Sequence, residues 1–404
     1  MAERPVYVLT NHWTFIANYF NHVIRHLSNR GVPVHAYAPG GPEPRVMEQM
    51  GCEARVHDVP FTPGALRPGQ LLRTIGHGWR LGRREPGGVF ALITALPHLL
   101  YGPPLRLLNR RCVFVMAGMG TLFSSNRRRH RAAGVVARRV YRWMYRGRNS
   151  VVVVQNTDDR RLVIDELGAP ADRVYLMPGC GVDTARFPFF ERLPDNPRPV
   201  ILVPARLIRE KGIGEACEAS RLLAERGVDH EMRFTYGFYP GNPMALGPAD
   251  LEEMKRRNPH LVFLGWQPSL VPVYEAADVV CLPTYREGLP STLLEGAACG
   301  RPLVTTDVPG PRDLVAHEES GLLVPARSPA ALADALQRVL ADRALAERLR
   351  RNAYRRFCEG FTKEHSLRSM LPAFAALGVP AAPEPAASES AARLLAHAAA
   401  PQRA

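Results

Sequence analysis

The amino-acid sequence predicts an α/β protein made of two doubly wound, Rossmann-like domains that face a cleft. Short apolar runs alternate with segments of helical periodicity along most of the chain, a pattern typical of parallel sheets covered by helices. A Pro-rich segment interrupts this alternation once, near the middle. At about 150 residues per domain, the 404 residues, 46% of them hydrophobic, suggest two domains or three.

The first predicted domain covers residues 1–187. Residues 6–10 form a short β-rich run, 11–14 a polar turn, and 15–30 a helix that ends at Gly31. Residues 32–38 are the second expected strand. Further apolar runs that we expect to be strands between helices are 89–94, 113–116 and 151–155.

The second predicted domain covers residues 200–375, after a Pro-rich linker at 188–199. The last residues, 376–404, are rich in Ala and Pro and are expected to be a disordered tail. Within the domain the pattern predicts strands at 200–204, 232–236, 261–264, 279–282 and 303–305, and helices at 213–227, 291–299 and 329–359.

The composition excludes several classes of protein. The chain is too apolar to be disordered, and no apolar run approaches the roughly 20 residues of a membrane-spanning helix or suggests a signal peptide. The seven cysteines are scattered and form no metal-binding spacing, which indicates reduced, buried thiols in the cytosol.

The net charge of +14 is unevenly distributed. Residues 1–185 contain 25 Arg and no Lys against 12 acidic residues, whereas the remainder is nearly neutral. Two helical stretches, within residues 67–84 and 127–148, combine Arg with Trp and aliphatic side chains. Basic amphipathic helices of this kind suit an anionic membrane surface. A solvated charged face and a nucleic-acid surface are the alternatives, although no nucleic-acid-binding motif is present.

The segment from Tyr285 to Val304 is the most informative for chemistry. A loop leads from an expected strand into a helix with Pro290 at or near its first position. The backbone N–H groups of Gly288 and Leu289, together with the helix dipole, would make an anion site suited to a diphosphate. Glu287 and Glu295 would bind sugar and ribose hydroxyls on either side. Alternatively, Glu287 is a helix-start charge and Glu295 a solvated residue.

A second cluster, Arg206 and Lys211, follows the first strand of the second domain. The carboxyl ends of strands in open α/β sheets face the ligand crevice, so both cations could neutralise a pyrophosphate leaving group. Because the chain contains only three Lys (211, 255 and 363), Lys211 stands out more than Arg206, which could be an ordinary surface residue.

These residues together resemble a known family. Arg206-x4-Lys211, Glu287-x7-Glu295, Gly300-x-Pro-x-Val-x-Thr-Asp-Val-Pro-Gly310 and Gly321-Leu-Leu-Val are similar to motifs of the retaining GT-B glycosyltransferases of family 4. In the first half, Gly118-Met-Gly-Thr-Leu-Phe123, Gln155-Asn-Thr-Asp-Asp159 and Pro178-Gly-Cys-Gly-Val-Asp183 resemble the branch that extends polyprenyl-diphosphate-linked sugars.

The resemblance implies a role for each matched residue. Arg206 and Lys211 would hold the donor diphosphate, Glu287 would contact the donor sugar near the reacting carbon, and Glu295 would bind the ribose. Trp266 would lie by the nucleotide base. The donor would be a nucleotide-diphosphate sugar, with no cofactor. No metal is expected, since the chain has no Asp-x-Asp motif.

Two departures from the family affect the acceptor side. Many relatives have a Gly-Gly pair in the first strand–helix loop, where this chain has Asn11, Trp13 and Thr14, which we therefore predict to contact the acceptor. Relatives also often carry a His beside the donor sugar. Here His98 comes a few residues late, and we expect both His98 and His12 to be structural.

The expected function is that of a cytoplasmic, peripheral-membrane glycosyltransferase on the inner face of the cytoplasmic membrane. It would transfer a sugar from a nucleotide-diphosphate donor to a polyprenyl-diphosphate-linked saccharide in the assembly of cell-surface glycans. A soluble glycosyltransferase acting on a small-molecule acceptor is the first alternative. A non-catalytic nucleic-acid-binding or scaffold protein is the second.

Overall fold

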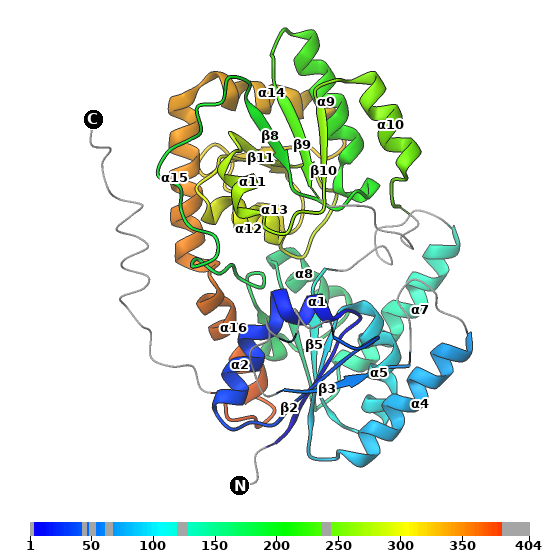
Figure 1. The fold of residues 1–404 in the computed structure, drawn as a ribbon. Coiled ribbons are helices and arrows are strands. Elements are labelled where there is room, and N and C mark those ends of the chain that lie inside the picture. Colours follow the sequence, from blue (N-terminus) through cyan, green and yellow to red (C-terminus); the bar gives the residue numbers. More distant parts are fainter. Residues whose placement is uncertain are drawn as a thin grey trace. The chain divides into compact units, whose positions relative to one another are not determined.

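The computed structural model describes residues 4–42, 47, 54–60, 68–118, 128–235 and 244–381 (Figure 1). The chain divides into two compact units. Among the described residues, the first combines the chain up to Cys180 with the segment from Lys363 to Ala381, and the second is Gly181–Thr362. Each unit is built on one parallel sheet.

The first unit contains a seven-stranded sheet in the order β3-β2-β1-β4-β5-β6-β7, with all strand pairs parallel. Successive side chains of β1 enter opposite cores, Val6 and Val8 on one face and Tyr7 on the other. Both faces are therefore covered, as the alternation of strands and helices predicts. The strands are β1 (Val6–Leu9), β2 (Val34–Ala38), β3 (Arg55–Asp58), β4 (Val89–Ile93), β5 (Arg111–Met116), β6 (Ser150–Val154) and β7 (Val174–Leu176).

Helices α4, α5 and α7 contribute to one core of this unit, while α2 and α16 contribute to the other. Figure 1 shows the C-terminal α16 beside α2, near the start of the chain, and the two helices are in contact. The helices are α1 (Trp13–Phe15), continued by a π-helical turn to Phe20, α2 (Asn21–Asn29), α4 (Pro68–Arg84), α5 (Ala95–Leu107), α7 (Arg128–Tyr145), α8 (Thr157–Arg161) and α16 (Lys363–Ala375).

The second unit contains a six-stranded parallel sheet in the order β10-β9-β8-β11-β12-β13 around a single apolar core. Its strands are β8 (Val200–Val203), β9 (Glu231–Thr235), β10 (Leu261–Gly265), β11 (Val279–Leu282), β12 (Leu303–Thr306) and β13 (Leu322–Val324). Its helices are α9 (Ile213–Glu225), α10 (Pro248–Arg257), α11 (Val271–Glu275), α12 (Ser291–Ala298), α13 (Pro311–Leu314), α14 (Pro329–Ala341) and α15 (Arg343–Gly360).

The structure corrects the division of the chain that the sequence suggests. Helix α16, assigned above to the second domain, returns to the first unit because Met370, Leu371 and Phe374 are buried in its core. Leu377 and Val379, expected in a disordered tail, are buried there as well. The expected linker at 188–199 lies in the second unit, where buried arginines bind its backbone. The rest of the tail, 382–404, lies outside the described residues.

The local predictions differ from the structure where a signal was short. The helix expected over 329–359 is two helices, because Asp342 has extended backbone and caps α15 by accepting from the N–H of Leu345 at 2.9 Å. Strands β3, β7 and β13 were missed. Strand β3 is partly exposed and lacks a continuous apolar run, and β7 and β13 are only three residues long. Tyr236, expected in a strand, lies outside the described residues.

Candidate active site

The two predicted donor-site segments follow neighbouring strands of the second sheet. Arg206 and Lys211 come after β8, Glu287 comes after β11, and β8 pairs directly with β11. The chain runs outward from β8 to β9 on one side and from β11 to β12 on the other, so the strand order reverses between β8 and β11. In open α/β sheets ligands bind at the carboxyl ends of the strands at such a reversal.

Lys211 and Glu287 form an ion pair between these two loops, from the ammonium Nζ to carboxylate Oε1. Only 16% of the Lys211 side chain and 14% of the Glu287 side chain are exposed. The Thr284 hydroxyl also donates to Glu287 Oε1, at 2.9 Å. The structure therefore brings together the two charged residues that the sequence placed 76 positions apart.

Backbone contacts hold the two loops against each other. The carbonyl of Glu210 accepts from the N–H of Tyr285 at 3.0 Å and from the hydroxyl of Thr284 at 3.2 Å. Gly212, with a φ of 71°, lies so close to β11 that a Cβ there would stand 2.0 Å from the carbonyl oxygen of Pro283. Only glycine allows both this conformation and this approach.

Glu295 lies on α12, where the hydroxyl of Tyr274 donates to its Oε2 at 2.9 Å. Burial raises the pKa of this carboxyl to about 7, although the Tyr274 hydrogen bond and the charge of Arg186 act in the opposite direction. A carboxylate accepts hydrogen bonds from hydroxyl groups, so an ionised Glu295 could bind a diol such as ribose.

The raised pKa makes a prediction for stability against pH. The folded state favours protonated Glu295. Ionisation of this group therefore lowers the free energy of unfolding as pH rises from about 4.5 to 7, and the group has no such effect below pH 4.5. The free energy of unfolding of a Glu295→Gln variant, relative to that of the wild type, should therefore rise by up to about 3 kcal/mol between pH 5 and pH 8. Urea unfolding at both pH values measures the difference. Glu252→Gln, at an exposed site, is the control, and a pH-independent difference for Glu295→Gln would contradict the prediction.

The structure corrects one detail of the expected anion site. Helix α12 begins at Ser291 with Pro290 as its N-cap, so Gly288 and Leu289 lie in the preceding loop and not in the first helical turn. The Leu289 side chain is buried in the core of the unit. Arg206 is exposed after β8, and Trp266 follows β10 with 63% of its surface exposed. Arg206 and Trp266 thus keep their predicted roles as proposals only.

Of the predicted acceptor-side residues, Asn11 and Thr14 are accessible but Trp13 is not. Trp13 is 5% exposed in the core of the first unit, and its indole N–H donates to the carbonyl of Gly40. Its role is therefore structural, which corrects the expectation. The Thr14 hydroxyl and His12 Nδ1 lie 2.7 Å apart, and His12 caps α1.

His98 is a core residue, as the sequence suggested. Its Nε2 lies 2.8 Å from the carbonyl oxygen of Leu92, and its Nδ1 lies 3.4 Å from the hydroxyl of Tyr145. Burial lowers its pKa to about 4, so the ring is neutral near pH 7.

Sequence reasoning missed several residues that position the site. Thr284 and Tyr274 hold the two glutamates, and the Tyr285 hydroxyl donates to Glu215 at 2.5 Å while its ring stacks under Arg327 at 4.4 Å. The motif quoted above begins at Tyr285, but nothing in the sequence indicates that Glu215 and Arg327 meet there.

Two family descriptions match the chain, one on each unit. "Glycosyl transferase 4-like domain" matches residues 16–180, and "Glycosyl transferases group 1" matches residues 186–356. Two solved structures share the fold over nearly the whole chain. Sucrose-phosphate synthase from Thermosynechococcus elongatus has a TM-score of 0.75 at 20% identity, covering 93% of this chain and 99% of its own. Anabaena HepE in complex with UDP and glucose has a TM-score of 0.70 at 14% identity, covering 92% of this chain and 99% of its own.

The two parallel sheets have the GT-B fold of the solved structures. Residues 16–180 are similar to a glycosyl transferase 4-like domain, and residues 186–356 are similar to the glycosyl transferases group 1.

Curated relatives differ in what they act on. D-inositol 3-phosphate glycosyltransferase of Jonesia denitrificans is 33% identical over 55% of this chain and 56% of its own length. Alpha-D-kanosaminyltransferase of Streptomyces kanamyceticus is 26% identical over 82% of this chain and 92% of its own length. A third relative, from Campylobacter jejuni, is 24% identical over 46% of this chain and 50% of its own length. It is an N,N'-diacetylbacillosaminyl-diphospho-undecaprenol alpha-1,3-N-acetylgalactosaminyltransferase. The chain thus spans about half the length of several curated relatives it matches.

Proposed function

We propose that the protein is a retaining glycosyltransferase that transfers a sugar from a nucleotide-diphosphate donor to an acceptor hydroxyl. The observation that carries this proposal is the Lys211–Glu287 ion pair at the point where strand order reverses between β8 and β11. A cation and a carboxylate at this position match the diphosphate and the sugar of such a donor. A UDP complex of the structural neighbour HepE supports a nucleotide donor.

In the proposed reaction, the bond between the anomeric carbon and the diphosphate oxygen breaks, and the acceptor oxygen bonds to the same face of that carbon. The leaving diphosphate accepts the proton of the acceptor hydroxyl. Lys211 and Arg206 stabilise the negative charge that develops on the diphosphate. Glu287 orients the sugar and stabilises positive charge near the reacting carbon. Glu295 binds the ribose, and Trp266 lies by the base. No metal and no further cofactor take part.

For the acceptor we propose a polyprenyl-diphosphate-linked saccharide. The Campylobacter relative, whose name includes such an acceptor, supports this choice. The second candidate is a small soluble acceptor, which the names of the inositol 3-phosphate and kanosamine enzymes favour. Asn11, on the loop after β1, and Thr14, on α1, remain the proposed acceptor-side residues.

A surface of the first unit supports membrane association. Exposed apolar side chains on α4 and α7 stand among exposed arginines. We call this the α4/α7 surface; its described members are Leu72, Ile75, Trp79, Val135, Val136 and Trp143, with Arg73, Arg80, Arg83, Arg84 and Arg139. The side chains of residues 67 and 127–133, also predicted to take part, lie outside the described residues.

The α4/α7 surface would place the protein on the inner face of the cytoplasmic membrane. Arginine attracts anionic headgroups, and Trp sits at the interface between headgroups and acyl chains. Part of the basic charge of α7 is used within the unit, since Arg142 and Arg146 donate to the carbonyls of Glu166 and Gly168. Over the residues that the structure describes, no helix has the length and apolar character needed to cross a bilayer.

The donor is tested by thermal shift with UDP-, GDP- and ADP-sugars, followed by transfer assays. A donor that binds only the folded protein raises the apparent melting temperature. Each donor that stabilises the protein is then offered with a polyprenyl-diphosphate saccharide and with the corresponding free saccharide. Transfer to the lipid-linked acceptor alone supports the first acceptor, and transfer to the free sugar alone supports the second. Stabilisation by none of the donors contradicts the proposed function.

Removing the exposed tryptophans of the first unit should weaken membrane binding. For Trp79→Ser combined with Trp143→Ser, we expect at least about a tenfold loss of affinity for vesicles of phosphatidylcholine and phosphatidylglycerol. Sedimentation with the vesicles measures this. Trp266→Ser, which removes an exposed Trp from the second unit, is the matched control. Equal vesicle binding by the wild type, the Trp79/Trp143 double variant and Trp266→Ser would show that the α4/α7 surface does not bind the membrane.

A further inference from the structure

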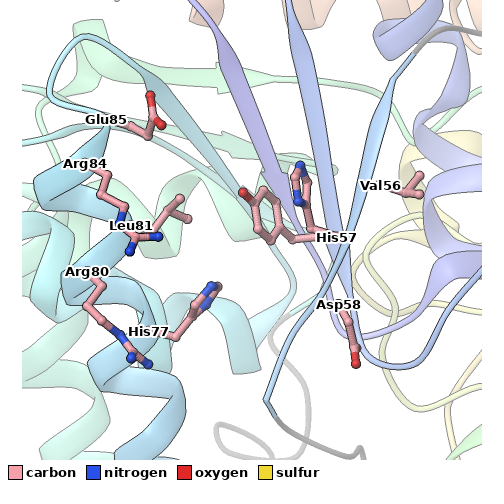
Figure 2. Close-up of a pocket in the computed structure, with 9 residues that line it drawn as sticks. Val56, His57, Asp58, His77, Arg80, Leu81, Arg84 and Glu85 are labelled. Carbon is pink, nitrogen blue, oxygen red and sulfur yellow. The ribbon is translucent and has the colours of Figure 1, made fainter.

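The first unit contains a pocket of about 700 Å³ that no part of the proposed reaction uses (Figure 2). It lies between edge strand β3 and helix α4. His57 and Asp58 line it from β3, while His77, Arg80 and Arg84 line it from α4. Figure 2 shows His77, Arg80 and Arg84 along one helix, across from the strand that carries His57. Their spacing of three and four residues places them on one face of that helix.

The Asp58 carboxylate at the pocket is already hydrogen-bonded within the protein. Its Oδ1 accepts from the backbone N–H groups of Gly40 at 2.7 Å and Val59 at 2.8 Å. Arg80 and Arg84 are exposed, and neither forms an ion pair with any residue that the structure describes. The pocket therefore presents two guanidinium groups outside any described ion pair, beside the carboxylates of Asp58 and Glu85.

The two imidazoles each use one ring nitrogen inside the unit. His57 Nε2 lies 3.1 Å from His35 Nδ1, and His57 stacks on Tyr37 with ring centroids 4.4 Å apart. His77 Nδ1 lies 3.1 Å from the hydroxyl of Tyr101. These contacts fix both rings and leave His57 Nδ1 and His77 Nε2 for a ligand.

The kinds of side chain that line the pocket suit an oxyanion better than a metal ion. Burial first, and then neighbouring arginines, lower the pKa values of His57 and His77, so the site resists further positive charge until an anion enters. Within the described part of the chain, no three His, Cys, Asp or Glu side chains are placed to hold a metal ion. Arginine forks and imidazole N–H groups are the ligands that phosphate oxygens prefer.

We propose that this pocket binds a phosphate group, with Arg80 and Arg84 as its charged ligands and His57 and His77 as hydrogen-bond donors. The volume exceeds that of a bare phosphate and suits a phosphorylated small molecule or lipid headgroup. The site belongs to the first unit, whereas the proposed donor residues belong to the second, so this inference does not depend on the proposed sugar transfer. Arg80 and Arg84 are also members of the α4/α7 surface.

The primary test is titration of the full chain with inorganic phosphate at low ionic strength, followed by NMR of the histidine side chains. His57→Gln and His77→Gln assign the two resonances, which report on this pocket even if phosphate also binds elsewhere. We expect saturable shifts of both. Arg80→Gln with Arg84→Gln should weaken binding at least about tenfold, since each lost charged contact contributes 1 kcal/mol or more.

The matched control is Arg73→Gln with Arg83→Gln, which removes the same charge from exposed positions of the same helix that do not line the pocket. Its affinity should stay within about twofold of the wild type, because neither Arg73 nor Arg83 lines the pocket. The absence of saturable histidine shifts in the wild type overturns the proposal. So does an equal loss of affinity in the two double variants.

A second arm identifies the source of the phosphate. Wild type and the Arg80/Arg84 variant are sedimented with phosphatidylcholine vesicles containing phosphatidic acid or phosphatidylglycerol, at matched surface charge. A preference for phosphatidic acid that the variant loses assigns the site to a lipid headgroup. Phosphate shifts without such a preference assign it to a soluble phosphorylated ligand. Both results support a phosphate site, and the histidine titration alone decides whether the site exists.

Discussion

Replacing Glu287 with glutamine should lower the rate of sugar transfer by about 10²–10³-fold while the second unit stays folded. Glutamine keeps the shape of the side chain and can still accept from the Thr284 hydroxyl, but it cannot neutralise Lys211. The Lys211 ammonium would then lose the carboxylate that fixes it between the loops after β8 and β11. Loss of this ion pair should cost about 1–3 kcal/mol of stability, too little to unfold the unit.

The second unit offers a matched control for this experiment. Lys255 and Glu252 form another Lys–Glu pair, on the exposed surface of α10, with side chains 45% and 69% exposed. Glu252→Gln should leave transfer unchanged, because an exposed pair contributes little and lies outside the site. Steady-state transfer assays and circular dichroism are run on both variants. If Glu287→Gln retains activity within threefold of the wild type, Glu287 does not take part in the reaction.

Replacing Arg350 with methionine should destabilise the second unit by about 3–5 kcal/mol. Arg350 on α15 is completely buried, and its guanidinium pairs with Glu347 at 2.7 Å. The same group donates to the backbone carbonyls of Phe190 at 3.0 Å and Glu191 at 2.5 Å, and it stacks on the ring of Phe189. Methionine fills part of the volume but leaves the two carbonyls without this donor, while Glu347 keeps Arg351 at 3.6 Å.

A loss of this size should lower the melting temperature of the unit by roughly 6–20 °C. Hydrogen exchange should also accelerate in residues 189–192, because Arg350 holds this segment against the unit. Arg343→Met, at an exposed position of the same helix, is the control and should change stability by no more than about 0.5 kcal/mol. Unchanged exchange at 189–192 in Arg350→Met would show that other contacts, such as those of Arg301, suffice to hold the segment.

Much of the fold could be read from local patterns. Buried parallel strands are continuous apolar runs, so 89–94 and 279–282 were recognised as the strands now seen as β4 and β11. Partly exposed strands such as β3 carry no such run and were missed. The pocket of the first unit was missed for the same reason, since His57, one of its four proposed ligands, lies on β3.

The candidate site, like the fold, could be predicted from the sequence only in part. Loops that follow buried strands could be identified, and charge at Lys211, Glu287 and Glu295 marked them as candidates. Whether a side chain in such a loop is accessible is not a local property. Trp13 lies in the segment predicted as the loop after β1, yet it begins α1, the core of the first unit buries it, and the carbonyl of Gly40 accepts from its indole N–H.

By itself the sequence determined that there are two α/β units, that basic charge is concentrated in the first, and that Arg206, Lys211, Glu287 and Glu295 are the candidate donor residues. Only the tertiary structure decided that β8 lies beside β11, that α16 returns to the first unit, and that residues 188–199 are bound to the second. Periodicity reports which face of an element is buried. Pairing between distant strands and burial of an arginine under distant carbonyls depend on contacts between residues far apart in the chain, which no local pattern records.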